Sequence, residues 1–432
     1  MAGINRKNVR ARVIRQGSHT SSGGEALEVD VALCRPRLLV LSSTYPRWAG
    51  DAEPGFVHEL AKRLAGRFDV TVLCPHSAKA ARQEGLDGVR VFRYRYAPDR
   101  WETLVNDGGI LGNLKRMPWK WLLLPSFVLA QWVASLQLKR RWRPDIVHAH
   151  WLLPQGVVAT GAGLAPLVVT SHGADLFALK GALFKQLRSA VVARAAAITV
   201  VSGAMRARLC EECPGTPVLT LPMGVDLDGR FALNDEVQRS ANTILFVGRL
   251  VEKKGLIYLI EAMPQVRSSH PEVHLDIVGF GPERDRLAER VRQLGVESSV
   301  RFVGAVPQAE LSRYYQSATV FVAPFIEAAG GDQEGLGLVV AEALGCGCPV
   351  VVGDVPAVHD LIGGAVECVV PQRDADALAK AVIRVMDDPV SAGRRALILR
   401  ERMQERFSWV SVTDRYADLF ESLIASSQPS HE

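Results

Sequence analysis

The chain has 432 residues, of which 48% are hydrophobic and 22% are charged. This length suggests two or three domains at roughly 100 to 200 residues each, and the composition is too apolar for a disordered chain. The 51 Lys and Arg residues exceed the 46 Asp and Glu residues and give a net charge of +5, which by itself does not indicate a nucleic-acid-binding protein.

Residues 1–36 are expected to form a flexible polar tail. They contain several Arg and Lys residues and a Ser/Gly-rich stretch at 18–24, and no apolar run follows these residues as it would in a secretory signal. The 7 cysteines are scattered and too few for a disulfide scaffold, which favours a reducing, cytoplasmic compartment. Cys210 and Cys213 could supply half of a zinc site, but without a second pair two thiols near a helix end are the simpler interpretation.

From residue 37 onward, short apolar runs alternate with longer helix-like segments, a pattern typical of βαβ units around a buried parallel sheet. The expected strands of a first series are 37–42, 70–74, 146–150, 167–170, 198–201 and 218–221, and those of a second series are 243–247, 274–278, 300–303, 319–322 and 349–352. The fold class is therefore α/β with two doubly wound halves. We place a first domain at 37–225, a polar linker at 226–241, a second domain at 242–408 and a closing helix at 409–426.

Residues 115–143 combine seven Lys and Arg residues and four Trp residues with no Asp or Glu. Lys120, Pro125 and Gln131 interrupt the most apolar part, so a helix that spans a membrane is not expected there. Two interpretations stay open. Basic and aromatic residues that flank an apolar helix are typical of peripheral contact with an anionic membrane, and they also suit a helix packed on the sheet with a basic last turn.

Two glycine-rich turns carry the residues with chemical potential. Arg249 and Lys254 lie between the strand 243–247 and a helix expected to begin near Leu256, where cations and a helix N-terminus together would hold a diphosphate; a solvated basic loop is the alternative. Glu334 and Glu342 stand eight positions apart around Gly335 and Gly337. Eight helical residues rise about 12 Å, comparable to the reach from a sugar across a diphosphate to a ribose.

At this point the sequence resembles the retaining glycosyltransferases of family 4, also called glycosyl transferases group 1. The resemblance rests on several motifs in order, which lie at 45–64, 150–156, 170–175, 200–202, 222–226, 248–255, 279–281 and 334–342. It implies the GT-B architecture, in which two Rossmann-like domains face each other, the first on the acceptor side and the second binding the donor. It also implies that the closing helix crosses back to the N-terminal domain.

The same resemblance implies roles for individual residues. His172, Arg249, Lys254 and Glu334 would be catalytic: Arg249 and Lys254 would bind the donor diphosphate, Glu334 would hold the hydroxyls of the donor sugar, and His172 would lie near the reacting sugar. A strand-end histidine bonded to backbone is the alternative for His172. The donor would also be bound by Gly335, Leu336, Gly337, Leu338, Glu342, Gly279, Gly281, Val303 and Gly304. His150 and Asp175 would shape the acceptor side, and no metal ligands are expected.

The implied activity is transfer of a hexosyl unit from a nucleotide-diphosphate sugar to an acceptor hydroxyl, with retention of anomeric configuration, without a metal or any cofactor besides the donor. The implied setting is synthesis of a cell-envelope polysaccharide or glycolipid. The expected partners are the nucleotide-sugar donor and a glycan or lipid-linked acceptor, with no nucleic acid. The expected location is the cytoplasm, and a peripheral position on the cytoplasmic face of the membrane stays open. A GT-B phosphorylase, a nucleotide-sugar epimerase and a non-catalytic sugar-nucleotide-binding relative are the alternatives.

Overall fold

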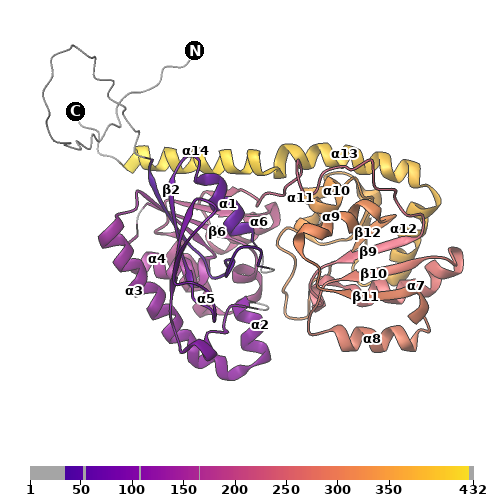
Figure 1. The fold of residues 1–432 in the computed structure, drawn as a ribbon, viewed down its shortest axis with the longest axis horizontal. Coiled ribbons are helices and arrows are strands. Elements are labelled where there is room, and N and C mark those ends of the chain that lie inside the picture. Colours follow the sequence, from indigo (N-terminus) through magenta and orange to yellow (C-terminus); the bar gives the residue numbers. More distant parts are fainter. Residues whose placement is uncertain (1–34, 52–54, 107–108, 165, 428–432) are drawn as a thin grey trace, which may run out of the picture.

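The structure is a computed structural model that describes residues 35–51, 55–106, 109–164 and 166–427. Residues 1–34 of the predicted tail therefore lie outside the described residues. The described chain forms two lobes, each built on one largely parallel sheet flanked by helices, and a pair of helices extends along both lobes at the top of the view (Figure 1). The α/β fold class with two doubly wound units is confirmed.

The sheet of the N-terminal lobe has the strand order β3-β4-β2-β1-β5-β6-β7-β8. All its neighbours pair in parallel except β3 and β4. The central strands β5 and β6 are buried at every position, as expected for a parallel sheet that helices cover on both faces. The strands are β1 Arg37–Leu41, β2 Asp69–Pro75, β3 Gln83–Leu86, β4 Val89–Tyr94, β5 Ile146–His150, β6 Leu167–Ser171, β7 Ala197–Val200 and β8 Val218–Thr220.

The sheet of the C-terminal lobe has the order β11-β10-β9-β12-β13-β14 and is parallel throughout. This is the doubly wound order, in which the direction of winding reverses between β9 and β12 and leaves a crevice at the carboxyl ends of those strands. The strands are β9 Thr243–Val247, β10 His274–Val278, β11 Val300–Gly304, β12 Val320–Ala323, β13 Val350–Gly353 and β14 Val369–Val370.

Every strand expected from the sequence forms, with its ends shifted by one residue at most. The sequence interpretation missed β3, β4 and β14. In β4, Arg90 and Arg93 interrupt the apolar run, yet the Arg93 side chain is buried and donates to the carbonyl oxygens of Ala81 and Pro46. A buried arginine with fixed hydrogen-bond partners is compatible with a strand, although its charge obscures the apolar pattern of the strand in the sequence.

The helices connect the strands in the expected alternation. Several begin at a side chain that caps the first turn, such as Ser202 before α6, Asp374 before α12 and Asp388 before α13. The helices are α1 Phe56–Leu64, α2 Gly109–Arg116, α3 Leu124–Trp142, α4 Val157–Gly161, α5 Ala182–Val192, α6 Gly203–Glu212, α7 Leu256–Ser269, α8 Arg284–Gln293, α9 Gln308–Ser317, α10 Leu338–Gly345, α11 His359–Ile362, α12 Ala375–Asp387, α13 Pro389–Phe407 and α14 Trp409–Ser427.

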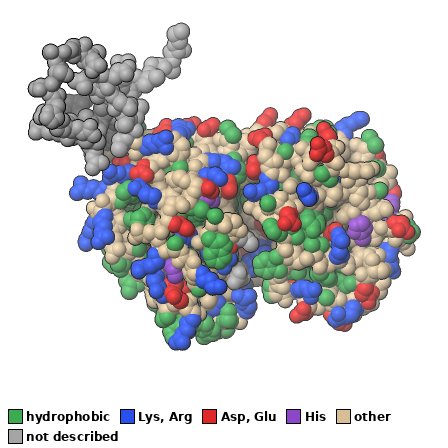
Figure 2. All heavy atoms as spheres, in the orientation of Figure 1, with side chains coloured by type: hydrophobic (Ala, Val, Ile, Leu, Met, Phe, Trp, Pro, Cys, Tyr) green, Lys and Arg blue, Asp and Glu red, His purple; other side chains and the backbone are tan. Residues whose placement is uncertain are grey.

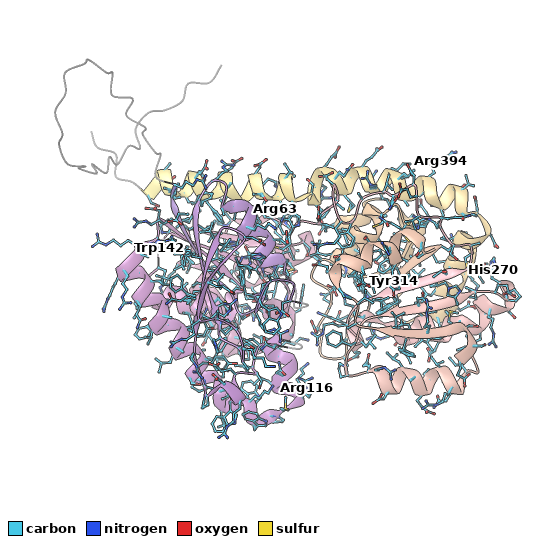
Figure 3. All side chains as sticks on the ribbon, in the orientation of Figure 1. Arg63, Arg116, Trp142, His270, Tyr314 and Arg394 are labelled. Carbon is cyan, nitrogen blue, oxygen red and sulfur yellow. The ribbon has the colours of Figure 1, made fainter. Side chains whose placement is uncertain are left out.

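The last helix, α14, crosses back to the N-terminal lobe as the resemblance implied (Figure 1). Phe420 is fully buried and packs edge-on against Phe68, with ring centroids 5.9 Å apart. The Tyr416 hydroxyl donates to the carbonyl oxygen of Leu221 at 3.2 Å. Arg63, labelled beneath the helix in Figure 3, has its guanidinium 4.8 Å from the Trp409 ring centroid. The helix therefore completes the core of a lobe whose other elements come much earlier in the chain.

One described stretch, Pro118–Trp142, is long and apolar enough to cross a membrane by length and composition. It consists of a short 3₁₀ helix, η2 at Pro118–Leu123, followed by α3. Its inner face packs on the sheet, where Phe127 is fully buried between the rings of Tyr94 and Tyr96. The stretch is therefore an integral layer of the N-terminal lobe.

Candidate functional site

The loops that follow the central strands of the two sheets meet between the lobes. A cavity of about 450 Å³ lies there, lined by Leu176 and Lys180 of the first lobe and by Gly331 and Gln333 of the second. The loops also touch directly, because a Cβ built on Gly335 would lie 2.6 Å from the carbonyl oxygen of His172. Only glycine fits at this contact, so the residue type at 335 sets how closely the lobes approach.

The rings of His148 and His150 on β5 and of His172, which directly follows β6, form a row. His172 lies closest to the second lobe, and its Nε2 is 2.9 Å from Nδ1 of His150, with the two rings stacked. Burial lowers the pKa of His172 to about 3 and the pKa of His150 well below its ordinary value. Both imidazoles are therefore neutral near pH 7. His150 is almost completely buried behind His172, so it positions the neighbouring ring.

The loop after β6 is held by Asp175, the second residue predicted on the acceptor side. Its carboxylate accepts hydrogen bonds from the Leu152 backbone N–H at 2.6 Å and from the Ser171 hydroxyl at 2.8 Å. Burial raises the pKa of Asp175. The two bonds fix the loop after β6 against the turn after β5, so both carboxylate oxygens already have partners within the lobe.

On the second lobe, Glu334 and Lys254 form an ion pair in which Oε2 lies 2.8 Å from Nζ. Burial by itself raises the pKa of Glu334, but the ammonium groups of Lys254 and Lys253 outweigh that effect and lower it to about 2. Glu334 is thus ionised at any physiological pH. Its Oε2 is buried against the Lys254 ammonium, so the ion pair fixes the position of the carboxylate.

Glu342 lies on α10, whereas Glu334 precedes that helix. Its Oε2 accepts a hydrogen bond from the Tyr315 hydroxyl at 2.9 Å. Burial raises the pKa of Glu342 to about 6, although the bond from Tyr315 and the charges of Arg230 and Lys254 act in the opposite direction. The two glutamates, eight positions apart in the sequence, are therefore both largely ionised at pH 7, and Glu342 is the one that gains a proton as the pH falls toward 5.

The predicted nucleotide-binding glycines also come together. The backbone joins their loops, since Gly248 N–H donates to Val278, Leu250 N–H to Phe280 and Gly279 N–H to Gly304. A Cβ on Gly279 would lie 1.9 Å from the Gly248 carbonyl oxygen, and one on Gly281 would lie 2.4 Å from that of Leu250. These glycines are needed for the close approach of neighbouring loops. Val303 and Gly304 end β11 at the same edge of the sheet.

The donor residues Gly335 to Leu338 lead into α10. Gly337 adopts a positive φ of 84° and begins that helix, so the backbone N–H groups of its first turn lie beside Glu334. Arg249 reaches the other way, because a Cβ on Gly112 of α2 would lie 3.8 Å from its Nη2. The structure thus brings Lys254, Glu334, Gly335 and His172 together and places Arg249 close to the first lobe.

Several residues around the site were not expected from the sequence. Tyr315 on α9 bonds to Glu342, and Lys253 pairs with Asp332 at 3.2 Å. The Trp151 and Phe56 rings pack on His172 with centroids 4.9 and 5.0 Å away. Lys253 is adjacent to Lys254, so its position in the basic turn already indicated a role at the site. The other contacts depend on tertiary packing.

Cys210 and Cys213 are free thiols, and within the described residues neither belongs to a group of three side chains close enough to share a metal ion. Across the described ranges, the one group of three side chains close enough to share a metal ion is His76, Asp99 and Glu102. Both ring nitrogens of His76 are already hydrogen bonded, Nδ1 to Glu102 and Nε2 to the carbonyl oxygen of Ala80.

Comparison with known proteins identifies the family to which both lobes belong. The family described as "Glycosyltransferase Family 4" matches residues 56–228, and "Glycosyl transferases group 1" matches residues 234–406. A glycogen synthase of Mycobacterium tuberculosis is 30% identical over 409 residues, which cover 89% of this chain and 94% of the relative. A GDP-mannose-dependent alpha-(1-6)-phosphatidylinositol monomannoside mannosyltransferase of Mycolicibacterium smegmatis is 31% identical over 276 residues, or 61% of this chain and 72% of the relative.

The solved structure of sucrose-phosphate synthase from Thermosynechococcus elongatus has the same fold, with a TM-score of 0.74 at 24% identity, and the match covers 91% of this chain and 100% of that one. The two family matches cover both lobes, one on each side of the cleft between His172 and Glu334. The chain therefore belongs to glycosyltransferase family 4 and is a glycosyltransferase of the GT-B architecture.

Proposed function

We propose that the protein transfers a hexosyl unit from a nucleotide-diphosphate sugar to an acceptor hydroxyl, with retention of the anomeric configuration and without a metal ion, in the synthesis of a cell-envelope polysaccharide or glycolipid. The observation that carries this proposal is the ion pair of Lys254 and Glu334 at the start of α10, opposite His172. The pair offers a cation for the diphosphate and an ionised acceptor for sugar hydroxyls at one point of the cleft.

The main energetic problem in such a transfer is the negative charge that develops on the departing diphosphate. Lys254 supplies a fixed cation, Lys253 adds to the local positive potential, and the first turn of α10 presents backbone N–H groups. Fixed donors of this kind, in a site shielded from water, stabilise a developing anion strongly. We assign to them the electrostatic role that a divalent ion has in other transferases. Arg249 would contact the diphosphate from the side of α2.

Glu334 would hold the hydroxyls of the donor sugar, and Glu342 with Tyr315 would hold the ribose. His172 is neutral. It would therefore orient the reacting sugar through a hydrogen bond and would not act as a charged proton donor. The departing phosphate oxygen would then take the proton of the acceptor hydroxyl as the new glycosidic bond forms on the same face. We assign Asp175 a structural role in this route, because its carboxylate holds the loop after β6 through Leu152 and Ser171.

A panel of UDP-, GDP- and ADP-sugars tests the proposal. Each donor is mixed with the purified protein in EDTA, and binding is followed by calorimetry and nucleoside-diphosphate release by chromatography. We expect one base and one sugar to be selected, with release that survives EDTA and is lost in Glu334→Ala. Release that requires a metal, phosphate-dependent sugar release, or epimerisation without an acceptor would each contradict it, as would a sugar trapped on a carboxylate.

A further inference from the structure

An apolar groove runs from the reaction centre to the outside of the N-terminal lobe. It encloses about 480 Å³ and is lined by α2, η2, α3 and the turn after β5, with Leu114, Trp121, Leu124 and Val128 among its side chains. That volume is typical of ligand pockets, which span roughly 300 to 1,000 Å³. Asp175 is the one charged residue in the lining, and its carboxylate already has partners. A sugar ring placed here would lose its hydrogen bonds to water without replacement, which is costly.

The inner end of this groove opens at the proposed site of transfer. Trp151 lines the groove and also packs on His172. Leu179 lines both the groove and the cavity between the lobes that Gln333 borders. On α2, Leu114 faces the groove, and Gly112 lies beside the guanidinium of Arg249. A molecule that occupies the groove would therefore present its end to the donor.

The outer end continues into an open groove along η2 and α3, with a volume of about 600 Å³ and a lining that includes Trp121, Pro125, Leu129 and Trp132. Beside it Leu122 is 81% exposed and Leu129 is 58% exposed. Figure 2 shows hydrophobic side chains on the lower part of the N-terminal lobe, with Lys and Arg side chains among them. Exposed apolar surface of this kind marks a site of contact with another protein, a ligand or a membrane.

The polar residues that break this stretch in the sequence do not break its outer surface. Lys120 is almost completely buried and donates to the Thr103 carbonyl oxygen at 2.8 Å and to Asn113 Oδ1 at 3.0 Å. Gln131 is likewise fully buried. Only 22% of the most apolar 18-residue window is buried. The outer face is thus continuous in its apolar character although the sequence is not.

Charge completes the description of this surface. Lys115 and Arg116 precede it, Arg140, Arg141 and Arg143 follow it, and residues 109–144 contain no Asp or Glu. Figure 3 labels Arg116 at the bottom of the lobe and Trp142 on its outer side, so the cations lie at both ends of the apolar stretch. Basic residues that flank an apolar helix suit contact with anionic lipid headgroups.

We infer that the acceptor is a membrane lipid, or a glycan linked to one, whose hydrocarbon chain lies in this groove and passes over α3 into the bilayer. The inference rests on the proposed function and specifies its acceptor. The acceptor hydroxyl would lie beside His172, and α3 would lie on the membrane surface without crossing it, because its inner face is packed on the sheet. A soluble glycan acceptor would need no such groove.

Vesicle flotation tests the membrane contact. We compare the full-length protein with the double variant Leu122→Ser/Leu129→Ser. The control is Leu397→Ser/Ile398→Ser on α13, because Leu397 and Ile398 are also exposed, by 46% and 51%. The wild type is expected to float with vesicles of phosphatidylcholine and phosphatidylglycerol, and less with phosphatidylcholine alone. The first double variant should lose roughly tenfold or more in partitioning, and the α13 control should lose little. Absence of flotation, or equal loss in both variants, would overturn the inference.

Photolabelling tests the groove itself. A phosphatidylglycerol with a diazirine in its acyl chain, presented in the same vesicles, should label Leu114 and Leu124. Val128→Trp fills the groove and should reduce this labelling about tenfold or more, while Val133→Trp, on the same helix but outside the groove, should not. Donor binding by calorimetry accompanies every variant. Labelling elsewhere, with donor binding intact, would overturn the lipid acceptor alone, whereas absence of donor binding in the wild type would overturn the proposed function.

Discussion

Glu334 and Glu342 are both buried carboxylates, yet their neighbours move their pKa values in opposite directions. Two ammonium groups surround Glu334, whereas the main partner of Glu342 is the neutral hydroxyl of Tyr315. A buried carboxylate stays ionised only when nearby charge offsets the loss of hydration. The proposed contacts to sugar and ribose should therefore respond differently to pH.

Replacement of Lys254 by Met should lower kcat by about 10²- to 10³-fold, the usual effect of removing one fixed donor from a developing anion. Lys253→Met should lower it less, because Lys253 pairs with Asp332 and donates to the carbonyl oxygen of Gln333, whereas Lys254 pairs with Glu334 itself. Steady-state kinetics with the donor selected above measure both. Equal losses in the two variants would show that general positive charge matters more than the pair with Glu334.

Donor affinity should fall as the pH drops from 7 to 5, because the pKa of Glu342 is raised to about 6 and the carboxylate that accepts from the ribose is lost below it. In Tyr315→Phe the midpoint should move up by about one pH unit, since a hydrogen bond to a charged group contributes about 1.5 kcal/mol and one pKa unit corresponds to about 1.4 kcal/mol. Calorimetric titrations across this range provide the measurement. Glu342→Gln should remove the pH dependence, and its persistence there would assign it to another group.

At the scale of the elements, the loop between β12 and α10 brings the backbones of the two lobes into close contact at Gly335. Gly335 has no room for a side chain because the backbone of His172 occupies the space, whereas Gly330 in the same loop has nothing within 4 Å. The contact aligns Glu334 with His172. A methyl group added at residue 335 would therefore displace the start of α10.

Gly335→Ala should therefore lower kcat/KM by roughly tenfold or more, because a displacement of about 1 Å at a reacting centre has effects of this size. Gly330→Ala serves as the matched control and should leave transfer nearly unchanged. Thermal unfolding of both variants separates loss of alignment from loss of stability. Similar activity in Gly335→Ala and the wild type would mean that the lobes move apart during turnover.

The elements differ in how far the sequence could predict them. Buried parallel strands such as β12 consist of apolar residues throughout, so their positions follow from the pattern alone. The glycine motifs predicted the turns themselves, whereas the close approach of Gly279 to Gly248, which excludes any Cβ, is known only from the structure. The burial of Lys120 could not be predicted, since its partners Thr103 and Asn113 are fixed by how η2 and α2 pack. The bond from Tyr315 to Glu342 also depends on tertiary packing.

At the scale of the whole molecule, α14 joins the two lobes and belongs to the core of the first. Arg67 reinforces it with ion pairs to Asp418 and Glu421. These exposed pairs contribute little, and most of the stabilisation comes from the buried aromatic face.

Phe420→Ala should lower the free energy of unfolding by about 3 to 5 kcal/mol, as expected for loss of a fully buried Phe. Val410→Ala on the same helix removes an exposed side chain and should change stability by less than about 0.5 kcal/mol. Urea unfolding followed by circular dichroism measures both. A small effect of Phe420→Ala would show that the N-terminal lobe keeps its stability without α14.

The path of α14 also bears on how the protein is made. Arg67 and Glu421 are in contact although 354 residues separate them along the chain. In the finished protein, Phe420 and Tyr416 pack over apolar side chains of the first lobe, Phe68 among them. While the ribosome is still translating the second lobe, these side chains are exposed. The first lobe thus leaves the exit tunnel well before it can complete its core, and during that interval its open face is a binding site for chaperones.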